Sequence, residues 1–347
     1  MKKILSICIP TYNMELFLSH CLNSFIVDKI YMDKLEIIVV NDGSKDSSSS
    51  IAHEYAVKYP NNYIVIDKSN GNYGSCINAA LKIASGKYFK ICDADDKYDT
   101  KNLIDFITYL EKVDTDIVFS SFSTFNNTGI VQNFGECPNS MVGKAWHIDD
   151  IDWRKYEIMR FREMHGLATK TMLFKNNKYV QTEGISYTDT QFSFYSLLYS
   201  NTCSFFNKSI YLYNIEREGQ TTSISSMKKS HFHFYINADK MLESYRKISD
   251  SLSKNKQSVL LDCIYVETLS FVDVFLGNFY NVDKQVTLVK SLLEKAKQSY
   301  NFCPLEEHLL HSSFKYRLWK KYYIPIPVIY ILSSVYRCFS FVIKRKI

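Results

Sequence analysis

Several familiar site patterns are missing from this chain of 347 residues. Its nine cysteines form no CxxC pair and have no histidine partners at zinc-finger spacing, which argues against a structural zinc site. No GxGxxG fingerprint and no P-loop ending in Gly-Lys-Ser/Thr occurs, so a dinucleotide or ATP site is not expected. Internal repeats are also absent, and the serine run at 47–50 indicates a helix N-terminus rather than a low-complexity tract.

A long apolar leader is absent as well. The apolar run Ile4–Ile9 follows two lysines but stops at Pro10, short of the roughly 7–15 residues that a signal peptide needs. We therefore expect a buried first strand there. The scattered cysteines are expected to be reduced, buried thiols of a cytosolic protein. With 46% apolar and 22% charged residues, the chain has the composition of a protein that folds around a core.

Acidic residues are missing from the C-terminal end, where none follows Glu307. Eight positive charges lie there, which leaves the rest of the chain close to neutral despite a net charge of +6. The segment Tyr322–Ile343 is largely apolar, but two prolines and an arginine interrupt it. We expect residues 314–347 to form a basic amphipathic tail on an anionic membrane surface, neither a span nor a nucleic-acid site. A terminal helix packed on the protein, with its basic face in solvent, is the alternative.

Short apolar runs alternate with helix-like stretches in the N-terminal part. The expected strands are 4–9, 35–40, 63–66, 88–92 and 117–119, and the expected helices are 16–26, 48–58, 75–84 and 101–112. This alternation predicts an α/β fold with a Rossmann-like, mostly parallel sheet and helices on both faces. The pattern loosens after residue 123, with a helix candidate around 149–164, and helix resumes after about residue 230. We therefore expect domains at 1–225 and 226–313, the second a helical extension, followed by the tail.

Polar clusters follow three of the expected strands. They are Thr11–Asn13, Asn41–Ser44 and Asp93–Asp96. Binding sites in such folds gather at the carboxyl ends of the strands. Gly43 permits a tight turn with positive φ, which would hold Asp42 at the sheet edge, where its carboxylate can accept hydrogen bonds from a base or ribose. Taken alone, the same residues would equally be a turn with a helix N-cap.

Three acids in Asp93–Asp96 repel one another unless a cation lies among them. A hard divalent ion such as Mg²⁺ or Mn²⁺ binds carboxylate and diphosphate oxygens together, and it neutralises charge on a departing nucleotide. A solvated acidic turn that caps a helix starting near Asp99 is the alternative. Asp95–Asp99 also reads DDxxD, the signature of isoprenoid synthases, but that motif belongs on a helix. A haloacid-type phosphatase would need Thr or Val where Lys97 stands.

The loop Lys68–Ser75 leads into another helix. Gly71 and Gly74 beside the helix N-terminus would let backbone N–H groups approach a phosphate.

Taken together, these segments resemble the family 2 glycosyltransferases, which have the GT-A fold. The matching segments are Ser6–Asn13, Glu36–Asp46, Asn78–Asp96 and Gly184–Phe192. Their order and spacing agree over roughly residues 4–195, more than half of the chain.

The resemblance implies a role for each matched position. The residues implied to bind the sugar nucleotide are Pro10, Tyr12, Asn13, Asp42, Asn70, Asp93 and Arg217. Asp42 would contact uracil or ribose, and Arg217 lies where such enzymes often have a mobile basic loop. Asp95 would be the direct ligand of Mg²⁺ or Mn²⁺, and Asp189 would be the general base. Taken alone, Asp189 would more readily be an N-cap for the helix 190–199.

Two positions depart from the family pattern. The acid that usually precedes the base is Thr188 here, which puts acceptor contacts by that side chain in doubt. The common Ala-Arg-Asn is replaced by Cys76-Ile77-Asn78, so one basic contact to the nucleotide is missing.

The sequence therefore predicts an inverting glycosyltransferase that moves a sugar from a UDP-sugar to a hydroxyl of a lipid-linked saccharide in cell-surface polysaccharide synthesis. It would be cytoplasmic, on the inner face of the cell membrane. A non-catalytic sugar-nucleotide-binding or membrane scaffold protein of the same fold is the alternative, and replacement of Asp189 would separate the two. A nucleotidyltransferase would need a Gly-rich basic loop after the first strand, and Pro10–Asn13 does not offer one.

Overall fold

The computed structural model describes residues 2–136, 138–153, 163–216, 224–276, 282–298, 309 and 311–320. The chain divides into two compact units: residues 1–218 with 253–259, and residues 219–252 with 260–347. The domain boundaries expected at residues 225 and 313 remain predictions.

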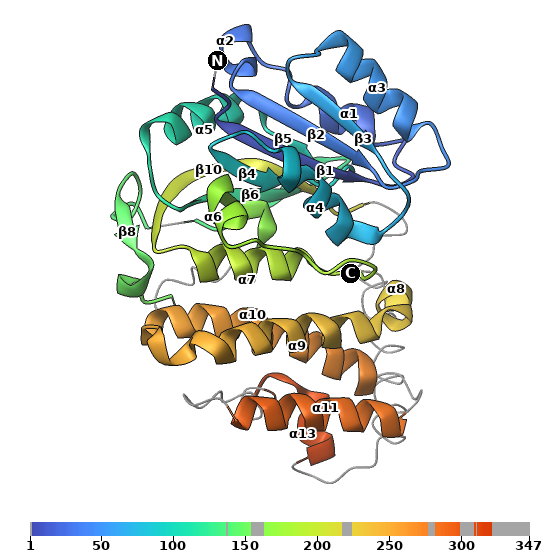
Figure 1. Ribbon diagram of the computed structural model, residues 1–347, viewed down its shortest axis with the longest axis vertical. Coiled ribbons are helices and arrows are strands. Elements are labelled where there is room, and N and C mark those ends of the chain that lie inside the picture. Colours follow the sequence, from blue (N-terminus) through green and yellow to red (C-terminus); the bar gives the residue numbers. More distant parts are fainter. Residues whose placement is uncertain are drawn as a thin grey trace. The chain divides into compact units, whose positions relative to one another are not determined.

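A ten-stranded sheet forms the core of the first unit (Figure 1). Its strands are β1 (Leu5–Thr11), β2 (Leu35–Asn41), β3 (Tyr63–Asp67), β4 (Tyr88–Ile91), β5 (Lys97–Tyr98), β6 (Ile117–Asn126), β7 (Gly129–Phe134), β8 (Ala145–His147), β9 (Leu167–Lys170) and β10 (Thr202–Asn214). Their order is β3-β2-β1-β4-β9-β6-β10-β5, with β7 on β6 and β8 on β10. The four strands from β3 to β4 are parallel, as are β6 and β10, whereas β5, β7, β8 and β9 run antiparallel to their partners. The expected α/β fold is confirmed, but the sheet is mixed, with four parallel and five antiparallel strand pairs among the described residues.

The connections place helices on both faces of this sheet. The chain adds β2 and then β3 on one side of β1, and it crosses back from β3 to β4 on the other side. Because crossovers between parallel strands are right-handed, α3 (Ser48–Lys58) and α4 (Asn72–Ile83) cover opposite faces. The strand order thus reverses between β1 and β4, which is where open α/β sheets bind ligands.

β1 and β2 are buried along their length because helices cover both faces of the sheet. Every residue of β2 is buried, and Pro10 is the one partly exposed residue of β1. The register pairs Thr11 with Asn41, so both strands end at the same level. The loops that follow them therefore start side by side.

The other helices of this unit are α1 (Leu18–Asn23), α2 (Lys29–Met32), α5 (Thr100–Lys112), α6 (Thr171–Asn176) and α7 (Asp189–Tyr199). The helix expected at 48–58 has those bounds, and the helices expected at 16–26, 75–84 and 101–112 are present with shifted ends. The cysteines of the described part of the chain are buried free thiols, as expected.

The helix expected around 149–164 is wrong over its described part. Short 3₁₀ turns occupy Ile148–Asp150 (η1) and Met164–Gly166 (η3), and Ile151–Trp153 is not helical. Residues 154–162 lie outside the described residues. The strands β9 and β10 were not expected, because β9 has only four residues and β10 carries a polar, exposed bulge at Asn207 and Lys208.

The second unit is helical in its described residues, which confirms the expected C-terminal helical extension. The helices that contain its residues are α8 (Ile224–Lys229), α9 (His231–Ile248), η4 (Ser249–Ser251), α10 (Lys254–Leu276), α11 (Val282–Lys297) and α13 (Phe314–Lys320). α9 buries Phe234, Ala238, Met241 and Tyr245 at the spacing of one helical face. No helix within the described ranges is long and apolar enough to cross a membrane.

The segment before α7 is held against α4. The side chain of Asn78 donates to the carbonyl oxygen of Gln181 at 2.9 Å and accepts the Gln181 N–H at 2.8 Å. Gly74 lies so close to this segment that a Cβ built on it would be 2.0 Å from the carbonyl oxygen of Thr182. Glycine is therefore required at this position for the segment to reach α7 in its observed place.

Gly74→Ala tests this packing. The added methyl group collides with a backbone oxygen, so we expect the free energy of unfolding to fall by about 2–3 kcal/mol in denaturant titrations. Gly143→Ala is the matched control. A Cβ there meets nothing within 4 Å, and with a φ of +72° only the cost of left-handed backbone, about 1 kcal/mol, applies. Equal stability of Gly74→Ala and the unaltered protein would contradict the proposed packing.

Candidate active site

The loops after β1 and β2 are tied together at the edge where the strand order reverses. Asn13, with a left-handed φ of 53°, donates its N–H to the Ser44 hydroxyl at 3.1 Å. Its side-chain oxygen accepts the N–H of Lys45 at 2.8 Å. Tyr12 beside it is 46% exposed, and Pro10 is partly exposed at the end of β1. These three residues thus line one rim of the site, with the Tyr12 ring accessible to a ligand.

Asp42 is a buried carboxylate, with 3% of its surface exposed. Its Oδ1 atom accepts hydrogen bonds from the Lys68 ammonium at 2.6 Å and from the Gly71 N–H at 2.9 Å. Asn70 donates to the Asp42 carbonyl oxygen at 3.0 Å. The N-cap of α3 is Ser47 rather than Asp42, so the simple capping role does not apply. Asp42 and Asn70 are therefore in contact, and their role in binding the nucleotide remains a prediction.

Lys68 is a site residue that sequence reasoning missed. Its ammonium group also donates to the carbonyl oxygen of Ser69 at 2.6 Å and to the Ser75 hydroxyl at 2.8 Å. Ser75 directly precedes Cys76-Ile77-Asn78, which offers no basic side chain of its own. The signal that could have indicated Lys68 is its position, directly after the end of β3 and three residues before Gly71. Lys68 supplies a positive charge beside Asp42.

Three carboxylates form a cluster at the end of β4. Ligand atoms of Asp93, Asp95 and Asp96 lie within 4.8 Å of one another. Burial, the charge of Asp95 and other nearby groups raise the pKa of Asp93 to about 7. Burial and the charges of Asp93 and Asp95 also raise the pKa of Asp96. Burial and mutual repulsion therefore disfavour the ionised forms of Asp93 and Asp96.

The members of the cluster differ in their protein contacts. Asp96 is buried, and its two oxygens accept hydrogen bonds from the Tyr211 hydroxyl at 2.5 Å and the Asn214 N–H at 2.7 Å. Asp93 accepts the Tyr73 hydroxyl at 2.8 Å. Asp93 and Asp95 are only partly buried, so they could reach a metal ion while Asp96 supports them. A hard divalent cation fits this set of oxygen ligands.

The alternative role for this cluster, helix capping, is taken by another residue. Asp99 is the N-cap of α5, and its carboxylate accepts the Asn102 N–H at 2.8 Å. Asp95 and Asp99 thus do not share a helix, which also removes the diphosphate signature of helical isoprenoid synthases.

Asp189 is the first residue of α7, and Thr188 is the N-cap. The N-cap position thus falls one residue before Asp189, but the Asp189 carboxylate still accepts hydrogen bonds from backbone N–H groups at the start of α7, so a structural role for it stays open. Burial raises the pKa of its carboxyl group, and His165 and nearby backbone N–H groups act against that rise. The charge of Asp189 in turn helps to raise the pKa of Asp93. The two carboxylates thus belong to one electrostatic cluster, although 96 positions separate them in the sequence.

Thr188 does not take the place of the acid that usually precedes the base. It is fully buried, and its hydroxyl and carbonyl oxygens accept hydrogen bonds from the Gln181 amide at 2.8 and 3.0 Å. Tyr187 before it has a left-handed φ of 62°. Left-handed backbone at a non-glycine residue is often found at functional sites. Thr188 anchors this turn and leaves Asp189 as the carboxylate that faces the cluster.

The turn η3 contributes His165, which sequence reasoning also missed. The buried Lys90 ammonium holds this turn through the carbonyl oxygens of His165 at 2.5 Å and Leu167 at 3.1 Å. Burial lowers the pKa of Lys90 to about 7. The His165 ring packs against Tyr211, with ring centroids 4.7 Å apart, and its Nδ1 lies 3.7 Å from Glu163. His165 thus interacts electrostatically with both Asp93 and Asp189, and it acts against the rise in the pKa of each.

Arg217 and the tail from residue 321 onward lie outside the described residues, so their predicted roles stay predictions. Pro10 lies in β1, one residue before its end, and each other predicted site residue lies after β1, β2, β3 or β4 or at the start of α7.

Residues 6–175 match the model of the family described as Glycosyl transferase family 2. The poly(ribitol-phosphate) beta-glucosyltransferase of Bacillus spizizenii is 26% identical over 303 residues, which cover 86% of this chain and 44% of that protein. The minor teichoic acid biosynthesis protein GgaB of Bacillus subtilis is 43% identical over 91 residues, 26% of this chain and 10% of that protein. The chain thus spans less than half the length of these relatives.

Solved structures with the GT-A fold resemble the chain. The crystal structure of Staphylococcus aureus TarS 1–349 matches with a TM-score of 0.61 and 18% identity, covering 92% of this chain and 91% of that one. Its complex with UDP-GlcNAc matches with a TM-score of 0.51 and 20% identity, covering 88% and 90%. A mannosyltransferase from Pyrobaculum calidifontis, in complex with GDP-Man and Mn²⁺, matches with a TM-score of 0.52 and 16% identity, covering 96% and 87%.

Proposed function

This chain contains a family 2 glycosyltransferase region with the GT-A fold, and on this premise we propose that it is an inverting enzyme that transfers a sugar from a UDP-sugar to an acceptor hydroxyl. The observation that carries the proposal is the grouping of Asp93 and Asp95 with Asp189 at one edge of the sheet. Transfer needs a positive charge that stabilises the leaving nucleotide and a base that activates the acceptor hydroxyl. Asp93 and Asp95 would hold a metal ion for the first role, and Asp189 would be the base.

The nucleotide would lie over the loops after β1, β2 and β3. Lys68 and Gly71 occupy one oxygen of Asp42, so the other oxygen is the acceptor for a uracil N–H or a ribose hydroxyl. Tyr12 and Asn13 line the rim, and Lys68 adds a positive charge near an anionic ligand. The UDP-GlcNAc bound by TarS supports UDP as the nucleotide.

Asp95, with Asp93, would hold a Mg²⁺ or Mn²⁺ ion at the diphosphate. When bound, such an ion neutralises charge that develops on the departing UDP. Tyr73 fixes Asp93 through its hydrogen bond, and Tyr211 and Asn214 fix Asp96 behind it. The Mn²⁺ bound by the mannosyltransferase neighbour supports a divalent ion in this role.

Asp189 would remove the proton of the attacking hydroxyl. Burial raises its pKa above the ordinary value, which makes the carboxylate a stronger base. His165 opposes this rise and favours the ionised form that the reaction requires. Attack on the face opposite the leaving UDP inverts the anomeric carbon.

The transferred sugar would be a hexose or an N-acetylhexosamine, and the acceptor a lipid-linked saccharide or another chain of a cell-surface polymer. The names of the relatives, which refer to teichoic acid and poly(ribitol-phosphate), support a surface polymer as the acceptor. The whole enzyme would work in the cytoplasm, on the inner face of the cell membrane. α13 and the basic residues after it would then contact anionic lipid.

Asp189→Asn separates catalysis from mere binding. Loss of the base should lower the rate of transfer by about 10²- to 10⁴-fold, while UDP still raises the melting temperature in the presence of Mn²⁺. Sugar transfer and thermal unfolding measure the two effects. Asp105→Asn is the matched control, because Asp105 forms an exposed ion pair with Lys208. It should change neither the rate of transfer nor the effect of UDP on the melting temperature. Full transfer activity in Asp189→Asn would remove Asp189 as the base, and a protein that binds UDP but never transfers sugar would support a non-catalytic scaffold.

Removal of residues 314–347 tests the membrane role. We expect the full chain to float with liposomes that contain anionic lipid and the shortened chain to stay with the soluble fraction, because the tail holds eight positive charges and no acid. Neutral liposomes serve as the control. Equal flotation of both chains would show that the tail does not anchor the protein.

A further inference from the structure

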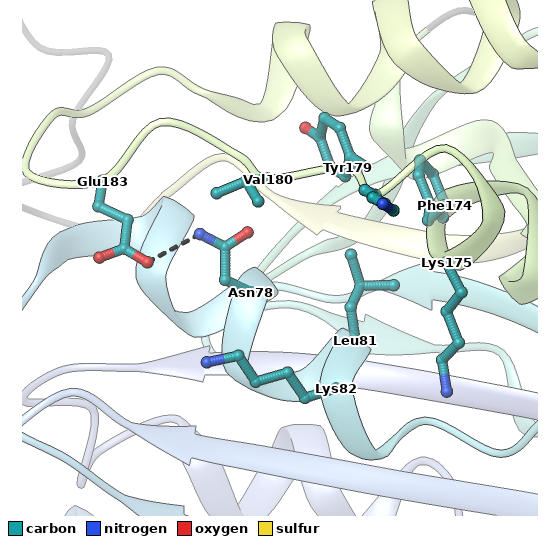
Figure 2. A pocket seen from close by; sticks show the side chains of 9 residues that line it. Asn78, Leu81, Lys82, Phe174, Lys175, Tyr179, Val180 and Glu183 are labelled. Atoms are coloured by element: carbon teal, nitrogen blue, oxygen red, sulfur yellow. Dashed lines mark hydrogen bonds between the residues drawn. The ribbon is translucent and has the colours of Figure 1, made fainter.

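A cavity of about 360 Å³ lies between α4 on one side and α6 with the segment that follows it on the other (Figure 2). α4 contributes Asn78, Leu81 and Lys82, and the opposite wall contains Phe174 and Tyr179. The rings of Phe174 and Tyr179 lie 5.1 Å apart and form an apolar surface. The function proposed above does not use this cavity.

The lining of the cavity carries three lysines and one glutamate: Lys82, Lys175, Lys178 and Glu183. Lys175 donates to the carbonyl oxygen of Ala84 at 2.7 Å, and Asn78 donates to Glu183 at 2.8 Å. Lys82 and Lys178 have no such partner among the described residues. Their ammonium groups are therefore available to an anion that enters the cavity.

Lys178 occupies a backbone position that seldom holds a lysine. It follows the C-cap of α6 with a left-handed φ of 49°. The N–H of Tyr179 donates to the carbonyl oxygen of Phe174 at 2.9 Å, which is the bonding of a helix end where glycine is the usual residue. A lysine is thus present where glycine would be less strained, which indicates that its side chain has a use.

The cavity is connected to the base of the reaction. Asn78, which holds Glu183, also binds the backbone of Gln181, and the Gln181 amide holds Thr188 directly before Asp189. Five residues separate Glu183 from Asp189, so at most roughly 20 Å of chain lies between them. An extended acceptor could occupy the cavity and the active site together.

We propose that this cavity binds a phosphate group of the acceptor chain, a phosphodiester-linked polymer, while another unit of that chain presents its hydroxyl to Asp189. This inference rests on the proposed function and names its acceptor class. Lysine ammonium groups bind phosphate as point charges, and the rings of Phe174 and Tyr179 suit the carbon skeleton of a sugar or polyol between phosphates. A neutral saccharide would leave the charges of the exposed Lys82 and Lys178 to water alone, whereas a phosphate would pair with them.

The test is binding of a fluorescent ribitol-phosphate octamer to the full chain, measured by anisotropy. Lys82→Gln with Lys178→Gly should weaken binding roughly tenfold, because each exposed ion pair contributes a factor of up to about five. The double variant should be as stable as the unaltered protein, since glycine relieves the left-handed backbone. Lys112→Gln, at the exposed end of α5, is the matched control and should bind the octamer normally.

The outcomes separate this inference from the proposed function. Unchanged octamer binding in the double variant, or no binding by the unaltered protein, overturns the inference, whereas failure to bind UDP with Mn²⁺ overturns the proposed function. Two further results would also overturn the phosphodiester assignment. One is binding of a neutral glucan octamer that is weakened by the same two lysine substitutions. The other is a double variant that binds the octamer normally but no longer binds vesicles that carry a prenyl diphosphate lipid, which would make the lipid headgroup the source of the phosphate.

Discussion

The crowding of carboxylates at the end of β4 is the constraint on which the rest of the site depends. Carboxylate oxygens of Asp93, Asp95 and Asp96 lie within 4.8 Å of one another, and the charge of Asp189 also acts on Asp93. Burial and mutual repulsion disfavour their ionised forms, so the surrounding protein has to supply donors and positive charge. Tyr73, on α4, and Tyr211, on β10, provide hydroxyl groups for two of the acids.

Segments that are far apart in the sequence provide these hydrogen-bond donors and positive charges. β10 brings Tyr211 and Asn214 to Asp96, and the buried Lys90 fixes the turn that carries His165. The Asn78 side chain and the absence of a side chain at Gly74 hold the segment that leads to Asp189. α4 thus joins the two parts of the site, because its first turn contacts Lys68 and its later turns hold the segment before Asp189.

Much of the donor half was predictable from the sequence. Strands such as 35–40 are continuous apolar runs that end in polar loops, and a parallel sheet collects those ends at one edge. Two other residues were harder to predict. Lys68, beside Asp42, and His165, which interacts with Asp189, act through contacts between segments that are far apart in the chain. β9 and β10 were missed because a short strand and a strand with a polar bulge have no clear alternation of apolar and polar residues.

The most direct test of the central claim is a calorimetric titration of UDP into the protein with and without Mn²⁺, repeated with Asp95→Ala. The account predicts that Mn²⁺ strengthens UDP binding in the unaltered protein and has no effect in Asp95→Ala, because the acidic cluster and the diphosphate share the ion. UDP binding that is equally strong without Mn²⁺, or equally dependent on Mn²⁺ in Asp95→Ala, would contradict it.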